Sequence, residues 1–228
     1  MHGSKDQMNS FSRWPRMNAL RSRIERWMGV SVGHRKLHMP SLETPHLILR
    51  KLDANDLKDI IAWNDFPAGQ TAEGEARKIL AYSFREYRER GIGPWGIQLR
   101  ATRALVGNCG FPHIIFKDFC GEMNCYIAPQ HRGQGLATEA LTALLKYGFR
   151  EIGLTRIRGR CAVDNLKSER VMLRIGMRFE GLVDDTLNSS SSSSKRKLYS
   201  ILATDFDLAS ARENASAIDA SARSEDHG

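Results

Sequence analysis

The sequence is poor in cysteine, with four in 228 residues, and it contains no Cys-x-x-Cys pair. Cys-x-x-Cys pairs are typical of structural zinc sites and of dithiol redox centres. Because the sequence lacks them, we predict no metal site and no redox pair. A chain of this length needs no disulfide scaffold, and we expect free thiols in a reducing compartment. Also missing are a run of 18 apolar residues and the apolar core of a secretory signal near the start. We therefore expect a cytoplasmic protein without a transmembrane segment.

The composition is that of a globular protein, with 41% hydrophobic and 26% charged residues. The length allows one domain of about 150–200 residues plus tails. The net charge is +8, but residues 1–40 carry eight Lys/Arg against two acids, and residues 205–228 carry two against six. The central part is only mildly basic. That charge suits an anionic ligand such as a nucleotide cofactor at least as well as nucleic acid, and we expect no DNA partner.

The chain divides into three predicted parts: a basic extension (1–40), a domain (41–205) and an acidic tail rich in Ala and Ser (206–228). In the extension, apolar residues recur every three or four positions between arginines, which predicts an amphipathic helix. This helix packs on the domain or on a partner subunit, lies on a membrane surface, or serves as a targeting segment. Inside the domain, the serines at 189–194 form a low-complexity loop of unknown role.

Hydrophobic periodicity and turn residues predict a mixed order of strands and helices in the domain. Strands are expected at 46–52, 95–99, 105–111, 122–128, 155–163, 177–183 and 197–203, the last two as a hairpin. Helices are expected at 53–63, 73–90, 135–151 and 168–175, with Ala76, Ile79, Leu80 and Phe84 on one side of the second. This alternation indicates an α/β or α+β sheet with helices on its faces.

The segment 130–137, Gln-His-Arg-Gly-Gln-Gly-Leu-Ala, follows a predicted strand and opens the strongest predicted helix. Its two glycines allow a sharp turn, after which backbone N–H groups point out of a helix N-terminus and can bind phosphate. The dinucleotide-binding pattern fails because Thr138 stands where the third glycine belongs, and the Walker pattern is absent. A plain tight turn before a core helix remains the structural alternative.

Several motifs in this order resemble the GCN-five-related N-acetyltransferases, the GNAT superfamily. The segment 130–137 matches their acetyl-CoA signature, and the likeness runs from Ser41 to about Asp205. Within the superfamily the chain is most similar to the RimJ/RimL-like ribosomal-protein N-acetyltransferases. The segments that carry this likeness are 42–50, 106–110, 135–140, 165–168, 175–177 and 180–181.

The resemblance implies a mixed, mostly antiparallel sheet splayed between its fourth and fifth strands, with helices on both faces. Acetyl-CoA is expected in the resulting cleft. The resemblance assigns its pyrophosphate to the backbone of Arg132, Gly133, Gln134, Gly135, Leu136 and Ala137. It also assigns its pantetheine arm to Tyr126, Ile127 and Ala128, which would pair with it like an added strand, and one further contact to Asn165.

Acetyl transfer to an amine needs a neutral amine, a donor for the oxyanion and a proton for the leaving thiolate. By resemblance, Glu122 is the candidate base, a backbone N–H near Tyr126 or Ile127 the oxyanion donor, and Ser168 the candidate acid. The alternatives are a solvated strand-end Glu122 and a Ser168 that only caps its helix. The superfamily's common tyrosine is replaced by Met172. Cys125 lies near the expected thioester, which would allow an acyl-enzyme intermediate. We favour the alternative that Cys125 is a small buried cysteine without a catalytic role.

The sequence thus predicts an N-acetyltransferase that moves acetyl from acetyl-CoA to a primary amine by direct attack in a ternary complex. The acceptor is a protein N-terminal α-amine or a small-molecule amine; the sequence does not name it. The competing interpretation is a non-catalytic CoA-binding module for regulation or assembly that acts through its basic N-terminal helix. Ribosome or RNA association through residues 11–36 and homodimer formation are left open.

Overall fold

A computed structural model of the protein describes residues 37–63, 71–184 and 195–207. The strands are β1 (Leu42–Glu43), β2 (Leu47–Lys51), β3 (Trp95–Leu99), β4 (Leu105–Ile115), β5 (Cys120–Ile127), β6 (Arg156–Ala162), β7 (Arg178–Asp184) and β8 (Lys195–Leu202). The helices are α2 (Leu57–Ala62), α3 (Ala72–Glu89), α4 (Leu136–Tyr147) and α5 (Leu166–Arg174). Short turns of 3-10 helix precede α2 and α4, and a π-turn ends α4. In the described ranges no helix has the length and apolar character needed to cross a membrane.

The eight strands form one sheet in the order β1-β2-β3-β4-β5-β6-β8-β7. All neighbours are antiparallel except β5 and β6, which run parallel and pair only between residues 120–122 and 156–158. Beyond these positions the two strands share no ladder, so the sheet opens between them. The predicted splay between the fourth and fifth strands is therefore confirmed. Because the short β1 adds a strand at the edge, these strands are β5 and β6 here.

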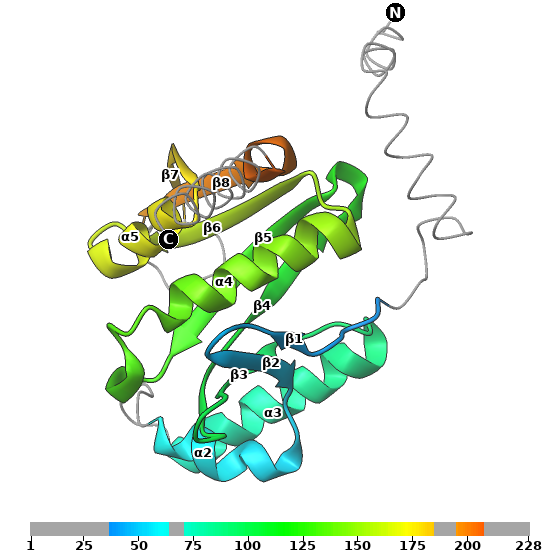
Figure 1. Cartoon of the computed structure of the whole chain (residues 1–228), viewed down its shortest axis with the longest axis vertical. Coiled ribbons are helices and arrows are strands. Elements are labelled where there is room, and N and C mark those ends of the chain that lie inside the picture. Colours follow the sequence, from blue (N-terminus) through cyan, green and yellow to red (C-terminus); the bar gives the residue numbers. More distant parts are fainter. Residues whose placement is uncertain (1–36, 64–70, 185–194, 208–228) are drawn as a thin grey trace, which may run out of the picture. The chain divides into compact units, whose positions relative to one another are not determined.

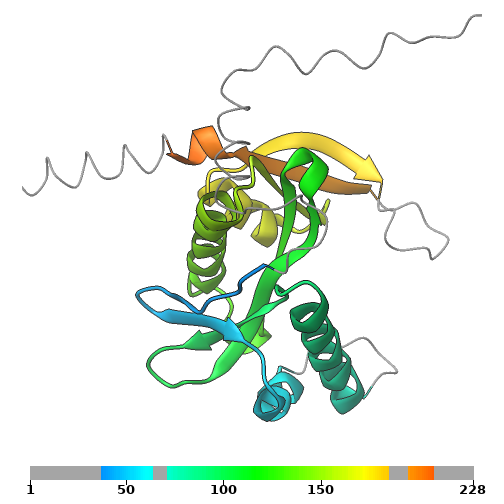
Figure 2. The same cartoon turned by 90° about the vertical axis from the view of Figure 1, so that its right-hand side faces the viewer.

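Helices cover both faces of the sheet, as predicted (Figures 1 and 2). On one face α4 and α5 lie over a large apolar core, which includes Leu141, Leu144, Ile157 and Met172. On the other face α2 and α3 cover a smaller core, which includes Ile60 and Leu80, together with residues of β4 and the β5 end. The larger core packs against strands on both sides of the opening, whereas the smaller core packs only on the β2–β5 side, and both stabilise the sheet by removing apolar surface from water.

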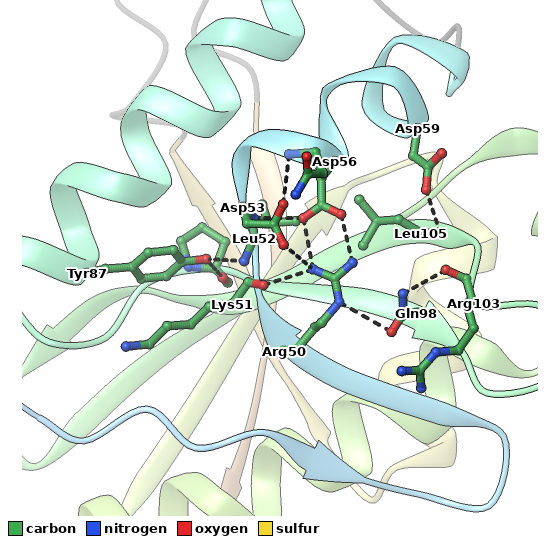
Figure 3. A network of polar contacts seen from close by, with 12 residues as sticks. Arg50, Lys51, Leu52, Asp53, Asp56, Asp59, Tyr87, Gln98, Arg103 and Leu105 are labelled. Carbon is green, nitrogen blue, oxygen red and sulfur yellow. Dashed lines mark hydrogen bonds and ion pairs between the residues drawn. The ribbon is translucent and has the colours of Figure 1, made fainter.

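A polar network ties α2 and α3 to the sheet (Figure 3). Arg50 on β2 donates to both carboxylate oxygens of Asp56, at 2.9 and 2.7 Å, and Asp56 is only 4% exposed. The Tyr87 hydroxyl of α3 accepts from the Leu52 amide and donates to the Pro94 carbonyl. Since charge-assisted bidentate bonds are the strongest of protein hydrogen bonds, this network fixes the helix pair on its face of the sheet.

The inward face of α3 differs from the prediction. Ala76 and Leu80 are buried as expected, but Phe84 is 40% exposed, and Ser83 and Glu86 are buried instead. Two polar residues fit there because each is satisfied: Ser83 donates to the Ile79 carbonyl and Glu86 pairs with Arg90 at 2.7 Å. The prediction for Phe84 was wrong because helical spacing alone does not distinguish satisfied polar groups from exposed ones.

The packed part of the domain begins before Ser41. Met39 is 4% exposed in the main core, and the Leu37 amide donates to the Arg90 carbonyl at 2.9 Å. The His38 and Pro40 carbonyls accept hydrogen bonds from Tyr147 and Trp95. These contacts place residues 37–40 with the domain. The predicted amphipathic helix, the 189–194 loop and nearly all of the tail lie outside the described residues, and the three-part division stays a prediction.

Candidate active site

A cleft of about 890 Å³ opens where β5 and β6 part. Its walls are the second half of β5, the loop before α4, the first turns of α4, the middle of β6 and one side of α5. The volume is within the range of sites for small molecules and cofactors. Of the predicted residues, Tyr126, Ile127, Arg132, Gly133, Gly135, Leu136, Ala137, Asn165 and Ser168 line it.

The loop before α4 has the geometry of an anion site. Gly133 and Gly135 have φ of +81° and +79°, a left-handed conformation that costs little only for glycine. A side-chain Cβ added at either position would meet no atom within 4 Å, so there is room for a larger residue. Glycine is favoured there because of the left-handed backbone conformation. The first intrahelical bond runs from the Glu139 amide to the Gly135 carbonyl. The amides of residues 136–138 have no carbonyl one turn back, and they suit a pyrophosphate.

The α4 N-terminus is held by the turn between β1 and β2. Glu139, in the first turn of α4, accepts hydrogen bonds from the Thr44 hydroxyl at 2.5 Å and from the His46 amide at 2.8 Å. The His46 ring lies 2.9 Å from its other oxygen. Partial burial raises the pKa of Glu139, but these hydrogen bonds outweigh burial and leave the pKa below its usual value. The ionised carboxylate also suits the positive end of the helix dipole.

The β5 backbone presents alternate residues to the cleft. The Ala128 amide donates to the Val106 carbonyl, and the Tyr126 carbonyl faces Gly107, so both point toward β4. In an antiparallel ladder the intervening residue turns its N–H and C=O the other way, which directs Ile127 toward the cleft. Among the residues of the pantetheine prediction, Ala128 is fully buried, its amide is bonded to β4, and it does not line the cleft; its contact with the cofactor stays a prediction.

The Arg132 side chain contacts residues at the end of β5. Its Nε donates to the Ile127 carbonyl at 2.8 Å, and its guanidinium lies 5.6 Å from the centre of the Tyr126 ring. These contacts hold the loop against the end of β5. Gln134, predicted beside it, is exposed and does not line the cleft. Its backbone belongs to the glycine turn, and the predicted backbone contact with the pyrophosphate stays a prediction.

Asn165 and Ser168 lie at the start of α5, on the far side of the cleft. Asn165 caps the helix, its Oδ1 accepting from the Ser168 amide at 3.0 Å. The cap is thus Asn165, and Ser168 takes part only through its backbone. No hydrogen bond joins the Ser168 hydroxyl to any residue of the described chain, and Ser168 lines the cleft. It is available to donate to a bound thiolate.

Glu122 lies on β5 but does not line the cleft. Both of its carboxylate oxygens are bound by Arg160 of β6, with Nε–Oε1 at 3.0 Å and Nη2–Oε2 at 2.6 Å. Arg160 itself lines the cleft, so the ion pair lies at its border. To accept a proton, Glu122 must release at least one oxygen from the guanidinium. Its role as base stays a prediction.

A nucleophilic role for Cys125 is disfavoured. The residue lines the cleft, but burial raises the pKa of its thiol to about 12. A thiol that stays protonated near neutral pH is a weak nucleophile. All four cysteines of the chain lie in its described part, and all are free.

A second, smaller hollow of about 290 Å³ lies on the α3 face, between α3 and the strands β4 and β5. It is lined by Lys78, Ile79, Tyr82, Pro94, Asn108 and Asn124, and therefore by no carboxylate. Asn124 borders both this hollow and the main cleft. Both cavities therefore border β5 at this residue.

Sequence reasoning missed Arg160 and the basic side of α5. Lys167, Arg170 and Arg174 all line the cleft. The sequence could have indicated both groups. The basic residues at 167, 170 and 174 recur at helical spacing and therefore share one side of a helix, and the arginines at 156, 158 and 160 recur at strand spacing and share one face of a strand. Among the described residues no cluster of three or more metal-ligating side chains is found.

Comparison with known proteins agrees with this geometry. The family model of the acetyltransferase (GNAT) domain matches residues 46–178. YoaA of Bacillus subtilis (strain 168), an uncharacterized N-acetyltransferase, is 31% identical over 172 residues, which are 72% of this chain and 97% of YoaA. The crystal structure of a GNAT-family acetyltransferase from Bacillus anthracis matches at TM-score 0.62 and 27% identity, and covers 72% of this chain and 99% of that one.

A third protein shares the fold at lower identity. RimJ of Mycobacterium smegmatis, solved in complex with CoA-disulfide, matches at TM-score 0.60 and 20% identity, over 72% of this chain and 89% of that chain. The family match covers more than half of the chain, and YoaA is matched over almost its whole length. The chain therefore belongs to the GNAT family of acetyltransferases.

Proposed function

We propose that the protein transfers the acetyl group of acetyl-CoA to a primary amine, by direct attack in a ternary complex. The observation that carries this proposal is the cleft in the splayed sheet, with the glycine turn and open α4 N-terminus at one end. A cofactor with a pyrophosphate and an extended arm has complementary chemistry to such a site. Acetyl-CoA supplies an activated acetyl thioester.

The reaction forms a bond between the amine nitrogen and the acetyl carbon and breaks the bond from that carbon to sulfur. The amine proton passes to Glu122, directly or through water, and the Ser168 hydroxyl donates a proton to the leaving thiolate. The Ile127 amide, turned toward the cleft by the β5 alternation, is the candidate oxyanion donor. The free hydroxyl of Ser168 and the border position of Glu122 support these roles.

We place the protein in the RimJ/RimL-like branch of the family. The support is the order of motifs along residues 42–181, and RimJ shares the fold. The acceptor is accordingly a protein N-terminal α-amine or a small-molecule amine. The smaller hollow on the α3 face, which shares the lining residue Asn124 with the cleft, is the place where we expect it to enter.

The test is calorimetric titration with acetyl-CoA, followed by measurement of CoA thiol release with a panel of amines and peptides. We expect binding and turnover with at least one acceptor. Glu122→Gln should lower kcat about 10²–10⁴-fold without changing acetyl-CoA affinity. Glu180→Gln is the matched control, because Glu180 pairs with Arg156 on β6, away from the cleft lining. Binding without turnover would favour the non-catalytic module, and the absence of binding would contradict the cofactor assignment.

A further inference from the structure

Three arginines of β6 share one face of the sheet. Arg156, Arg158 and Arg160 alternate with buried residues, and the buried positions 157, 159 and 161 face α4 and α5. Because side chains alternate along a strand, the arginines project to the opposite face. Glu122 projects to the same face, as its bonds with Arg160 show. This is the face on which α3 and the smaller hollow lie.

The three arginines differ in their partners. Arg160 is bound by Glu122, and Arg156 lies 3.5 Å from Glu180. Arg158 makes no ion pair with any described residue, and its Nε is buried without a hydrogen-bond partner. Among the buried side-chain nitrogen and oxygen atoms of the described residues, this Nε alone has no hydrogen-bond partner.

An unsatisfied buried donor on a charged group is costly, so native proteins retain it only where something else binds it. The planar guanidinium fork matches a carboxylate or a phosphate, which can accept two parallel hydrogen bonds. Arg158 therefore lacks the kind of group that the acidic neighbours supply to Arg156 and Arg160. An ordered water could satisfy the Nε alone, but it would leave the charge without a counter-ion.

Arg158 lies beside the proposed site, although it lines neither the cleft nor the smaller hollow. Its Cα pairs with that of Glu122, the candidate base, in the parallel ladder, and Arg160, two residues further on the same strand face, lines the cleft. No carboxylate lines the smaller hollow, while Glu122 and Glu180 are each already paired with an arginine. The local balance of charge is positive, which repels a polycationic acceptor and attracts an anionic one.

We propose that the acceptor is an amine that also carries a carboxylate or phosphate group, and that Arg158 binds this group. The inference rests on the proposed function, because it names the acceptor class for the same reaction. Arg158 selects the acceptor and takes no part in moving protons.

The experiment compares matched amines in the acetyl-CoA assay on the full-length protein. Glycine is paired with glycinamide, an acidic tetrapeptide with its amide analogue, and phosphoethanolamine with ethanolamine; spermidine is the cationic member. The first two pairs report a carboxylate and the third a phosphate. We expect kcat/KM to be at least about 10-fold higher for the anionic member of at least one pair, and spermidine to be the poorest acceptor.

Arg158→Gln should raise KM for the preferred anionic acceptor about 10–100-fold, with kcat changed less than about 3-fold and acetyl-CoA affinity unchanged. Arg156→Gln is the matched control, since it removes an arginine from the same strand face that already has a partner. Arg158→Lys keeps the charge but loses the fork, and should give an intermediate KM. This second variant keeps the test valid if the glutamine disturbs folding.

Two outcomes would overturn the proposal while leaving the proposed function intact. One is acetyl transfer with no preference for the anionic member of any pair. The other is an anionic preference that Arg158→Gln and Arg158→Lys leave unchanged. If acetyl-CoA binds but no amine is turned over, calorimetric titration of the CoA-loaded protein with the anionic members decides; absence of Arg158-dependent binding also overturns it. Failure to bind acetyl-CoA at all is different, because it contradicts the proposed function itself.

Discussion

Ser168 offers a clean test at the scale of single residues. Its backbone amide completes the Asn165 cap, while its hydroxyl bonds no described residue, so the side chain can be removed without loss of the cap. Ser168→Ala should lower kcat about 10²-fold or more if the hydroxyl protonates the thiolate, with unchanged thermal stability. Steady-state kinetics and a thermal melt measure both quantities.

Asn165→Ala is the comparison for Ser168→Ala, because it removes the helix cap itself. Loss of a helix N-cap costs about 0.5–2 kcal/mol, so this variant should lower Tm, which Ser168→Ala should not. Since Asn165 also lines the cleft as a predicted acetyl-CoA contact, kcat is compared at saturating acetyl-CoA. If Ser168→Ala keeps full kcat, or if its only effect is on Tm, the acid role is wrong and the serine is structural.

At the scale of residues, the sequence predicted which residues line the cleft better than it predicted which side chains bind each other. The residues that line the cleft came largely from one continuous motif, so their proximity follows from chain connectivity. The partner of Glu122 could not be derived, because Arg160 lies 38 residues further on. Only the parallel register of β5 and β6 brings the two together, and a motif does not encode that register.

At the scale of elements, the turn before α4 should depend on its backbone conformation. Gly135→Ala forces an L-residue to φ near +79°, which costs about 1–2 kcal/mol. We expect Tm to fall by about 2–6 °C and acetyl-CoA affinity to weaken about 10-fold, because the amide cradle relaxes to a less strained form. Calorimetry and a thermal melt measure these changes.

Gln134→Ala is the control for this prediction, since the residue between the two glycines is exposed and does not line the cleft. It should leave acetyl-CoA affinity within about 2-fold of the original. Equal affinity in the Gly135→Ala and Gln134→Ala proteins would mean that the turn conformation does not shape the phosphate site.

The contact between α4 and the β1–β2 turn should make stability depend on pH. The pKa of Glu139 is lowered in the folded state from a usual value of 4.5, because the bonds from Thr44 and His46 outweigh partial burial. A depressed carboxyl pKa adds stability above pH 4.5, and this is lost as pH falls through the folded pKa. Glu139→Gln should lower Tm by about 2–4 °C at pH 7 and by less at pH 3.

Thermal melts of both proteins at several pH values between 3 and 7 measure this difference. Glu151→Gln, at the other end of the same helical segment, is the control variant. A Tm difference for Glu139→Gln that stays constant from pH 7 to pH 3 would show that ionisation of this carboxyl does not stabilise the fold.

Which backbone groups of β5 face the cleft was beyond sequence reasoning. The alternation along β5 predicts two sets of residues but not which set points toward β4. That choice is made by the ladder with β4, whose register shifts at a bulge between Gly110 and His113. The Ala128 amide, for example, belongs to the β4 ladder, where it donates to the Val106 carbonyl.

At the scale of the whole molecule, the order of elements and the splay could be predicted because several motifs occurred in sequence. The start of the packed segment was not predicted, because residues 37–40 directly follow the basic pair Arg35-Lys36 and end at Pro40, so that composition and turn residues group them with the extension. Their place in the core comes from contacts made far along the chain, with Arg90, Trp95 and Tyr147. A boundary drawn from composition therefore cuts into the packed part of the domain.

Two truncations test where the domain begins. A protein that starts at Leu37 keeps the buried Met39 side chain and the three backbone contacts of this segment, so its Tm and acetyl-CoA affinity should match the full chain within about 2 °C and 2-fold. A protein that starts at Ser41 loses them. Removal of a buried Met side chain alone costs about 2–5 kcal/mol, so its Tm should fall by at least about 5 °C.

Met39→Ala in the full chain separates the apolar contact from the backbone bonds, and it should give part of the same decrease. Equal Tm values for the two truncations would place the start of the stable domain after Pro40, contrary to the burial of Met39. If instead the truncation at Leu37 loses stability, residues 1–36 contribute to the fold, and the prediction that they form an extension separate from the domain is wrong.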